Sequence, residues 1–137
     1  MKVFIDAGGY IALFDSSDQF YEPTQVFLSR LGEEIRPHTS NYVIDEVITF
    51  LSSRRGHWAA LKFIDFIFSS QIVVIHYIDE DMERKSLSLF RRYSDKNFSF
   101  TDITTIALLE KLNINRLLSF DQEFKKLGYL LVPQLSI

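Results

Sequence analysis

Segments with the length and composition of single β-strands alternate with helix-like segments along this chain. The strand-like segments cover residues 2–6, 34–38, 71–75, 116–120 and 129–132. Between them, apolar residues recur at the spacing of one helix face, which predicts helices over residues 21–31, 40–55, 58–68, 79–93 and 99–112. Because neighbouring parallel strands need a crossover connection, usually a helix, this alternation predicts an α/β fold. We expect a mostly parallel sheet that helices cover on both faces.

Some local features carry expectations of their own. Pro37 lies in the second strand-like segment and favours an edge strand or the end of a strand, since proline cannot donate to a ladder. The β-branched run at 71–75 is the clearest strand in the sequence. Ala-Gly-Gly at 7–9 is typical of a tight turn with an exposed backbone. Tyr10 and Trp58 are expected in the core.

Length and composition limit the class of protein. The chain has 137 residues, of which 47% are hydrophobic and 24% charged, so we expect one globular domain over residues 1–137. No apolar run approaches the ~20 residues of a membrane span, and the strand pattern at the start leaves no room for a signal peptide. The absence of cysteine excludes disulfides and thiolate metal sites and is consistent with a cytoplasmic protein.

The charge of the chain is weakly acidic. Fifteen Lys and Arg against eighteen Asp and Glu give a net charge of −3. This balance argues against a protein that coats nucleic acid nonspecifically. It does not argue against an enzyme that acts on nucleic acid, because such a site can be acidic where it holds metal and basic only at its rim.

Three carboxylates are expected at one edge of the sheet. Asp6 ends the first strand, and Asp121 follows the strand at 116–120. Asp102 lies in the first turn of a helix whose N-cap is Ser99, in a carboxylate version of the capping box. In open α/β sheets, ligands bind outside the carboxyl ends of the strands. We therefore expect the three acids to lie near one another.

A fourth acid comes from the helix that begins near residue 40. Asp45 and Glu46 are adjacent, so their side chains point about 100° apart and cannot both face one site. Val43 and Val47 mark the core side of this helix. Glu46 adjoins that side, where a carboxylate needs a partner, whereas Asp45 points further toward solvent. Glu46 is the candidate ligand and Asp45 a surface residue.

Carboxylates gathered in this way need a proton or a cation. Two unit charges ~4 Å apart near a surface repel by about 4 kcal/mol at an effective dielectric constant of 20. Oxygen ligands favour Mg²⁺ or Mn²⁺ over zinc, and one or two such ions could activate water and stabilise the leaving oxygen of a phosphodiester. Taken singly, each acid has a structural alternative as a helix cap or a partner of the helix dipole.

Four segments in order, VFIDAGGYIALFD, TSNYVIDEVITFL, YSDKNFSFTDITTIAL and LLSFDQEF, resemble the PIN-domain family. The family includes the compact toxin ribonucleases of bacterial and archaeal toxin–antitoxin pairs. The resemblance spans nearly the whole chain. It implies a single PIN-like domain, an α/β/α sandwich around a five-stranded parallel sheet, and metal-dependent endonucleolytic cleavage of RNA. It also implies homodimers and an antitoxin protein as partner.

The resemblance assigns roles to individual residues. The metal-binding acids would be Asp6, Glu46, Asp102 and Asp121. Ser119 would be the supporting hydroxyl two residues before the last acid. The family usually has a hydroxyl residue soon after the first Asp, where this chain has only glycines and an alanine. The backbone N–H near Gly8 is the support expected there instead.

Two groups of basic residues are candidates for contact with the RNA backbone, although charge on a helix face more often only solvates it. They are Arg54 and Arg55, and Arg91, Arg92 and Lys96. The three histidines, His38, His57 and His76, have no partner at metal-ligand spacing, so we do not expect them to be ligands.

The leading hypothesis is a Mg²⁺- or Mn²⁺-dependent endoribonuclease. The alternative is a PIN-like module that binds RNA or protein without cutting, because intact ligands do not prove turnover. A receiver-like signalling domain would need an acidic pair at the first strand and a suitable lysine, and neither is present. A phosphatase of the haloacid-dehalogenase type would need a second Asp at position 8, where this chain has Gly8.

Overall fold

The fold is a five-stranded sheet in which every neighbouring pair of strands is parallel. The computed structural model describes residues 1–95 and 97–135. The strands are β1 (Lys2–Ile5), β2 (Arg36–Ser40), β3 (Val74–His76), β4 (Arg116–Leu118) and β5 (Leu130–Val132). Their order across the sheet is β3-β2-β1-β4-β5, so β1 is central and the two strands after β3 lie on its other side.

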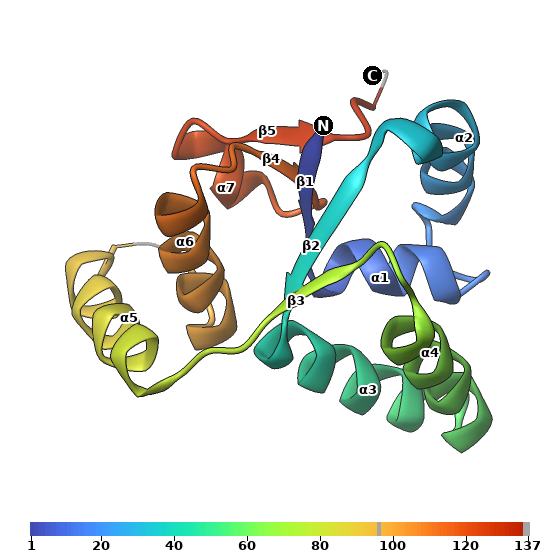
Figure 1. The fold of residues 1–137 in the computed structure, drawn as a ribbon, viewed down its shortest axis with the longest axis horizontal. Helices are drawn as coiled ribbons and strands as arrows, with labels where there is room; N and C mark the ends of the chain where they lie inside the picture. The colour runs from blue at the N-terminus through green and yellow to red at the C-terminus, as the bar shows by residue number, and fades with distance from the viewer. Residues whose placement is uncertain (96, 136–137) are drawn as a thin grey trace.

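Seven α-helices and one short 3-10 helix connect the strands in the described part of the chain. They are α1 (Ala7–Phe14), α2 (Tyr21–Leu31), η1 (Gly32–Glu34), α3 (Asn41–Arg55), α4 (His57–Ser69), α5 (Glu80–Arg92), α6 (Phe100–Leu112) and α7 (Gln122–Lys126). Helix α1 packs on α2 and α3, α3 packs on α4, and α5 packs on α6. Figure 1 shows the group from α1 to α4 on one side of the sheet and the α5–α6 pair on the other. The predicted α/β/α sandwich is confirmed.

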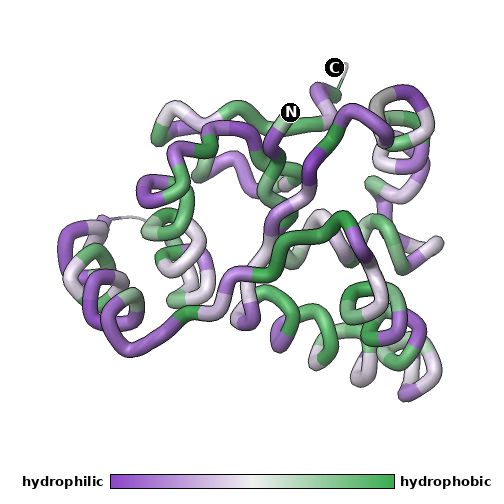
Figure 2. The backbone as a smooth tube through the Cα atoms, viewed as in Figure 1, coloured by the Kyte–Doolittle hydropathy of each residue, from purple (hydrophilic) through white to green (hydrophobic). Residues whose placement is uncertain are grey.

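Apolar side chains fill the space between the layers. Val3, Phe4 and Ile5 of β1 are buried, because the central strand has helices on both faces. Helix α5 is two-sided, with Met82 and Leu89 buried and its charged residues outside. Figure 2 colours hydrophobic residues green and hydrophilic residues purple, and both colours occur along α5. No helix in the described residues is long and apolar enough to cross a membrane.

The predicted helix ends are confirmed where their signals are local. The hydroxyl of Ser40 accepts a hydrogen bond from the Val43 N–H at the start of α3, and Asp79 caps α5. Ser99 and Asp102 form the predicted capping box of α6. Helix α3 stops before Gly56, whose φ of 95° favours glycine.

The turn predicted at residues 7–9 is wrong, because these residues form the first turn of α1. The carboxylate of Asp6 accepts a hydrogen bond from the Gly9 N–H (2.9 Å) and so caps the helix. Gly9 also has a packing role. A Cβ atom at this position would lie 2.5 Å from the carbonyl oxygen of Leu118. A glycine here therefore allows α1 to start directly against β4.

Two strand predictions need correction. Pro37 lies in β2, which is an internal strand and not an edge. The Arg36 N–H donates to the carbonyl of Met1, on the β1 side, so the nitrogen of Pro37 faces the β3 side, where pairing begins only at His38. The strand predicted at 71–75 is shorter and shifted in the structure, where β3 covers Val74–His76. The Ser70 hydroxyl accepts hydrogen bonds from the N–H groups of Ile72 and Val73, which form a turn before the strand.

The two aromatic residues predicted in the core differ in their burial. Tyr10 is buried, and its ring packs edge-on against Phe63. Trp58 is 78% exposed, so its prediction is wrong. It lies in the first turn of α4, where helical spacing alone did not reveal which side of the helix faces the core.

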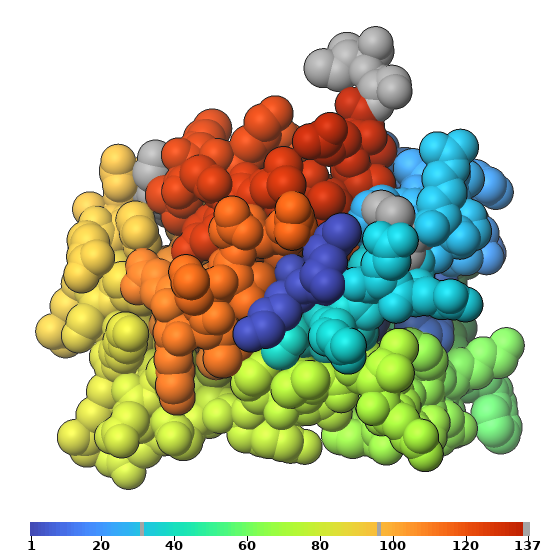
Figure 3. Space-filling model, turned by 45° about the horizontal axis from the view of Figure 1, so that its top comes forward, coloured from blue at the N-terminus to red at the C-terminus, as the bar shows by residue number. Residues whose placement is uncertain are grey.

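Figure 3 shows the edge where the strands begin, with the blue start of β1 between cyan and orange segments.

Candidate active site

The site forms where the chain switches sides of the sheet. Strand β1 pairs with β2 on one side and with β4 on the other, and Ile5 lies opposite Leu118. Asp6 and Ser119 directly follow these two residues, so they are neighbours although 113 positions separate them. The Ser119 hydroxyl donates a hydrogen bond of 2.5 Å to Asp6 Oδ2. Binding sites of parallel sheets occur at such a switch point.

Asp6 is the most perturbed carboxylate of the site. Its side chain is 8% exposed. The pKa of Asp6 is raised to about 7: burial is the main cause, hydrogen bonds from Ser119 and the Gly9 N–H oppose the shift, and the negative charges of Asp102 and Asp121 add to it. Near neutral pH the carboxyl group is thus divided between its protonated and ionised forms.

Asp102 faces this pair from the start of α6. Its Oδ2 accepts a hydrogen bond from the Ser99 N–H (3.0 Å), and its own N–H donates to the Ser99 hydroxyl (3.1 Å). The capping box therefore fixes where the carboxylate lies. Burial raises the pKa of Asp102, hydrogen bonding of its carboxylate to the backbone and side chain of Ser99 lowers it, and the charge of Asp121 raises it.

Asp121 lies three residues beyond β4 and has two local bonds. Its carboxylate caps α7 by accepting from the Glu123 N–H (3.0 Å), and its N–H donates to the Ser119 hydroxyl (3.2 Å). The same serine therefore holds both Asp6 and the backbone of Asp121. The local capping roles expected for the single acids are present, and the acids still lie close enough to perturb one another.

Glu46 joins the site from α3, which contacts α6. The first turns of both helices lie near the lower end of β2 in Figure 1. The residue as a whole is exposed, as is Asp45, yet the carboxylate is partly desolvated. Burial raises the pKa of Glu46, and the charges of Asp102 and then Asp45 add to the shift. The field of Asp102 thus reaches Glu46.

The donor set is chemically suited to a hard cation. All four groups are carboxylates, and the raised pKa values of three of them show that the ionised forms lack compensating positive charge. Within residues 1–95 and 97–135, no three acid or histidine side chains are close enough together to enclose a metal ion by themselves. The chemistry of the carboxylate oxygens, and not their spacing, is therefore what suits a hard cation.

The basic residues predicted to contact RNA have different environments. Arg55 is bound to the buried carboxylate of Asp15 through Nη2 (2.9 Å) and Nε (2.9 Å), which ties the end of α3 to the end of α1. Arg54 lies over the Phe50 ring. These two arginines are about 12 Å along the helix axis from Glu46.

The second basic group lies at the end of α5. Arg91 and Arg92 are exposed in the last turn of this helix. Lys96 lies outside the described residues.

Gly8, whose backbone was predicted to support the acids, is exposed. A Cβ atom there would meet only Asp6 Oδ1, at 3.6 Å.

Sequence reasoning missed two aromatic or imidazole pairs. His38 Nδ1 and His76 Nε2 are 2.8 Å apart because β2 and β3 are neighbours. The rings of Phe20 and Phe120 are stacked, with centroids 4.1 Å apart and an interplanar angle of 4°. Both pairs join distant parts of the chain, so no local spacing could reveal them. The position of Phe120 between Ser119 and Asp121 was the one available signal.

The fold and the site define a class: an α/β protein with a cluster of carboxylates at the switch point of a parallel sheet. The model of the PIN domain family matches residues 3–129. The chain belongs to the PIN domain family.

Relatives of known activity cover most of the chain. The 23S rRNA-specific endonuclease VapC20 of Mycobacterium tuberculosis is 29% identical over 129 residues, which are 93% of this chain and 95% of that protein. A VapC ribonuclease of Archaeoglobus fulgidus is 28% identical over 127 residues, which are 90% of this chain and 80% of that protein.

Solved structures show the same fold. The crystal structure of M. tuberculosis VapC20, described as a Sarcin-Ricin loop cleaving toxin, has a TM-score of 0.85 at 27% identity and covers 95% of this chain and 98% of that one. VapBC2 from Rickettsia felis, bound to a DNA fragment from its promoter, has a TM-score of 0.69 at 12% identity and covers 96% of both chains. The second likeness concerns the fold alone.

Proposed function

We propose that this protein is a metal-dependent endoribonuclease. The observation that carries the proposal is the buried carboxyl group of Asp6, whose pKa is raised to about 7 beside two further carboxylates. A fold gains nothing from burying acids together unless a cation or proton compensates them. Perturbed titrating groups of this kind cluster at functional sites. The similarity to proteins named VapC ribonucleases supports RNA as substrate.

In this proposal Asp6, Glu46, Asp102 and Asp121 hold one or two Mg²⁺ or Mn²⁺ ions. A bound divalent ion supplies the Lewis acid that activates water and stabilises the leaving oxygen of the phosphodiester. The protein's own residues position the carboxylates that would hold the ion. Ser119 fixes the carboxylate of Asp6, Ser99 fixes that of Asp102, and loss of the Asp6 proton makes the site competent to bind a cation.

The central test is cleavage of an RNA pool with mapped ends, with Mg²⁺ or Mn²⁺ and with EDTA. We expect cleavage that EDTA abolishes and that Asp6→Asn and Asp102→Asn reduce by at least about 100-fold, the scale of losing a charge-stabilising group. Full metal-dependent cleavage by both variants would refute the assignment. RNA binding without any cleavage would favour the non-catalytic alternative.

Glu46 has a matched control in its neighbour. Both residues are exposed acids on the same helix, and the charge of Asp102 is among the causes that raise the pKa of Glu46. Glu46→Gln should lower cleavage at limiting metal concentration, whereas Asp45→Asn should leave it unchanged. Equal effects of the two substitutions would remove Glu46 from the proposed ligand set.

The partners are part of the same proposal. We expect an antitoxin protein that binds this chain and inhibits it, and a homodimer in solution, which sedimentation and co-expression with the product of the neighbouring gene would test. An RNA substrate places the activity in the cytoplasm. Ribosomal RNA loops are the first substrates to try, because the relative VapC20 is named for cleaving 23S rRNA.

A further inference from the structure

A groove of about 530 Å³ adjoins the acidic site on the side of β4 and β5. It is formed by the residues after β4, by α7 and β5, and by the segment that follows β5. Ser119 belongs to both places, since it lines the groove and its hydroxyl donates to Asp6. A molecule in the groove would therefore lie next to the proposed position of the scissile phosphodiester. The volume is within the range of small-ligand sites.

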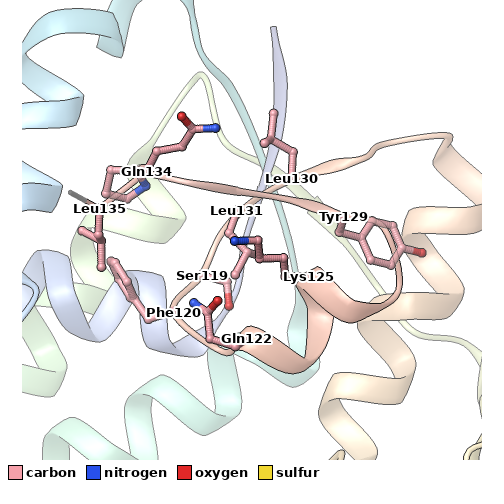
Figure 4. A pocket seen from close by; sticks show the side chains of 10 residues that line it. Ser119, Phe120, Gln122, Lys125, Tyr129, Leu130, Leu131, Gln134 and Leu135 are labelled. Carbon is pink, nitrogen blue, oxygen red and sulfur yellow. The ribbon is translucent and has the colours of Figure 1, made fainter. Parts of the chain in front are cut away.

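One end of the groove is apolar. Phe120 and Leu135 lie there together (Figure 4). The ring of Phe120 is held in place by its stacking on Phe20, at a centroid distance of 4.1 Å. An aromatic ring fixed in this way, one residue from Ser119 and from Asp121, presents a platform of defined orientation beside the acids.

The middle of the groove is polar and contains no acid. Gln122 and Lys125 extend from α7 toward Ser119 in Figure 4, and Gln134 lies on the opposite wall. Lys126 is paired with Glu123 (2.9 Å), whereas Lys125 forms no ion pair with any residue that the structure describes. The groove therefore offers two carboxamides, each with donors and an acceptor, and one positive charge.

These groups match the parts of a nucleotide. An unstacked base can lie against an aromatic ring, carboxamides can form paired hydrogen bonds with base edges, and an ammonium group can contact phosphate. Proteins that recognise RNA sequence target such unpaired bases. Apolar residues of β5 and of the segment after it also line the groove, so an apolar protein segment is the competing occupant that the experiment must distinguish.

We propose that this groove binds an unpaired nucleotide of the RNA, next to the cleaved phosphodiester. The base lies against Phe120, Gln122 and Gln134 contact its edge, and Lys125 contacts the adjoining phosphate. This inference rests on the proposed function and deepens it, because it assigns the contact with one base beside the cut to this groove. The preferred base at one position beside the cut is then set by the two glutamines.

The test measures binding and cleavage separately. Binding of a fluorescent single-stranded hexaribonucleotide is followed by anisotropy in EDTA, which prevents cutting. We expect Phe120→Ala to weaken binding by about 5- to 100-fold, the scale of losing one base–aromatic stack. Phe120→Leu keeps an apolar side chain for folding and should still lose at least about threefold, by the same reasoning. The matched controls Phe68→Leu and Gln71→Ala change exposed residues outside the groove and should bind like the wild type.

Hexamers with a single abasic position give a second readout. At one position, the abasic change should weaken binding to the wild type but not to Phe120→Ala, because the stacking partner is already absent. Gln122→Ala and Gln134→Ala should change which base is preferred beside mapped cut sites. An abasic penalty that is the same in wild type and Phe120→Ala would overturn the proposal.

The outcomes separate this proposal from the function on which it rests. Normal cleavage by the wild type, with all groove variants equal to it in binding and base preference, would overturn the groove proposal alone. Phe120-dependent binding of the hexamer without cleavage of any RNA would support the groove and refute the nuclease. If Phe120→Ala weakens binding of a purified protein partner and leaves RNA binding unchanged, the groove belongs to that partner and the proposal is wrong.

Discussion

At the scale of single residues, the acids of the site oppose the stability of the metal-free protein. The folded protein holds the pKa of Asp6 at about 7, against an ordinary value of 3.8. The folded state thus binds this proton more tightly than the unfolded chain. The resulting stability is fully present below about pH 4 and is lost as the pH rises to 7.

Asp6→Asn should therefore stabilise the metal-free protein at pH 8. Asparagine can still cap α1, and the buried charge is gone, so the free energy of unfolding should rise by as much as about 4 kcal/mol, by the scale of one pKa unit. The gain should shrink as the pH falls from 8 to 4, because wild-type Asp6 then becomes protonated. Thermal melts in EDTA across this range measure it, and a gain that does not depend on pH would contradict the assigned pKa.

Ser119 should help to set the pKa of Asp6. Its hydrogen bond lowers the pKa of that carboxyl group, so Ser119→Ala should raise the pKa further. The pH at which metal-dependent cleavage reaches half its maximum should then shift upward. Ser53→Ala, an exposed serine whose hydroxyl donates to the Phe50 carbonyl, is the control. A lower rate with an unchanged pH midpoint would mean that Ser119 acts only through the fold.

At the scale of elements, the contact between α1 and β4 positions the site. Gly9→Ala places a Cβ atom against the carbonyl of Leu118, and the strain should lower stability by about 1–3 kcal/mol. Gly8→Ala meets only ordinary contact, and alanine is favoured over glycine in a helix by about 0.5–1 kcal/mol. Urea unfolding of the pair should thus show opposite signs.

Activity distinguishes these two glycines as well. Movement of α1 away from β4 would carry Asp6, its N-cap, away from Ser119, so Gly9→Ala should also lose most cleavage. Gly8→Ala should retain it. Equal free energies of unfolding for the two variants would show that α1 can shift without loss of stability and that Gly9 does not position the site.

At the scale of the whole molecule, bound metal should hold together elements from both ends of the chain. Asp6 follows β1, and Asp121 directly precedes α7. Asp102 lies in the first turn of α6 and Glu46 in the second turn of α3. Millimolar Mn²⁺ or Mg²⁺ should raise the Tm by at least about 3 °C if the concentration exceeds the dissociation constant tenfold. The rise should be absent in Asp102→Asn and with NaCl at equal ionic strength. A Tm that neither ion changes in the wild type would count heavily against the four-acid site.

Much of the fold could be predicted because its signals are local. Ser40, Asp79 and Ser99 cap their helices as expected, since a cap and its target N–H lie three residues apart. The turn predicted at 7–9 failed for a tertiary reason. The glycines suggested a turn by composition, but Gly9 is small because β4 lies against it.

In the candidate site too, some residues could be predicted from the sequence and others could not. Sequence pattern and family resemblance together selected Asp6, Glu46, Asp102 and Asp121. The sequence did not reveal the stacking of Phe20 on Phe120, the groove beside it or the His38–His76 pair. The two ring pairs each join residues more than 30 positions apart, and the groove forms only because β5 pairs with β4 and α7 packs on β5.

The amino-acid sequence by itself determined the alternation of strands and helices, their caps, and the placement of an acid after β1 and at the start of α6. These properties depend on interactions between residues a few positions apart. Only the tertiary structure decided that Asp6 is buried beside Ser119, that its pKa rises to about 7, and that a groove adjoins it. Burial and the fields of neighbouring charges depend on which distant segments pack together, and the pairing of β1 with β4 makes that choice.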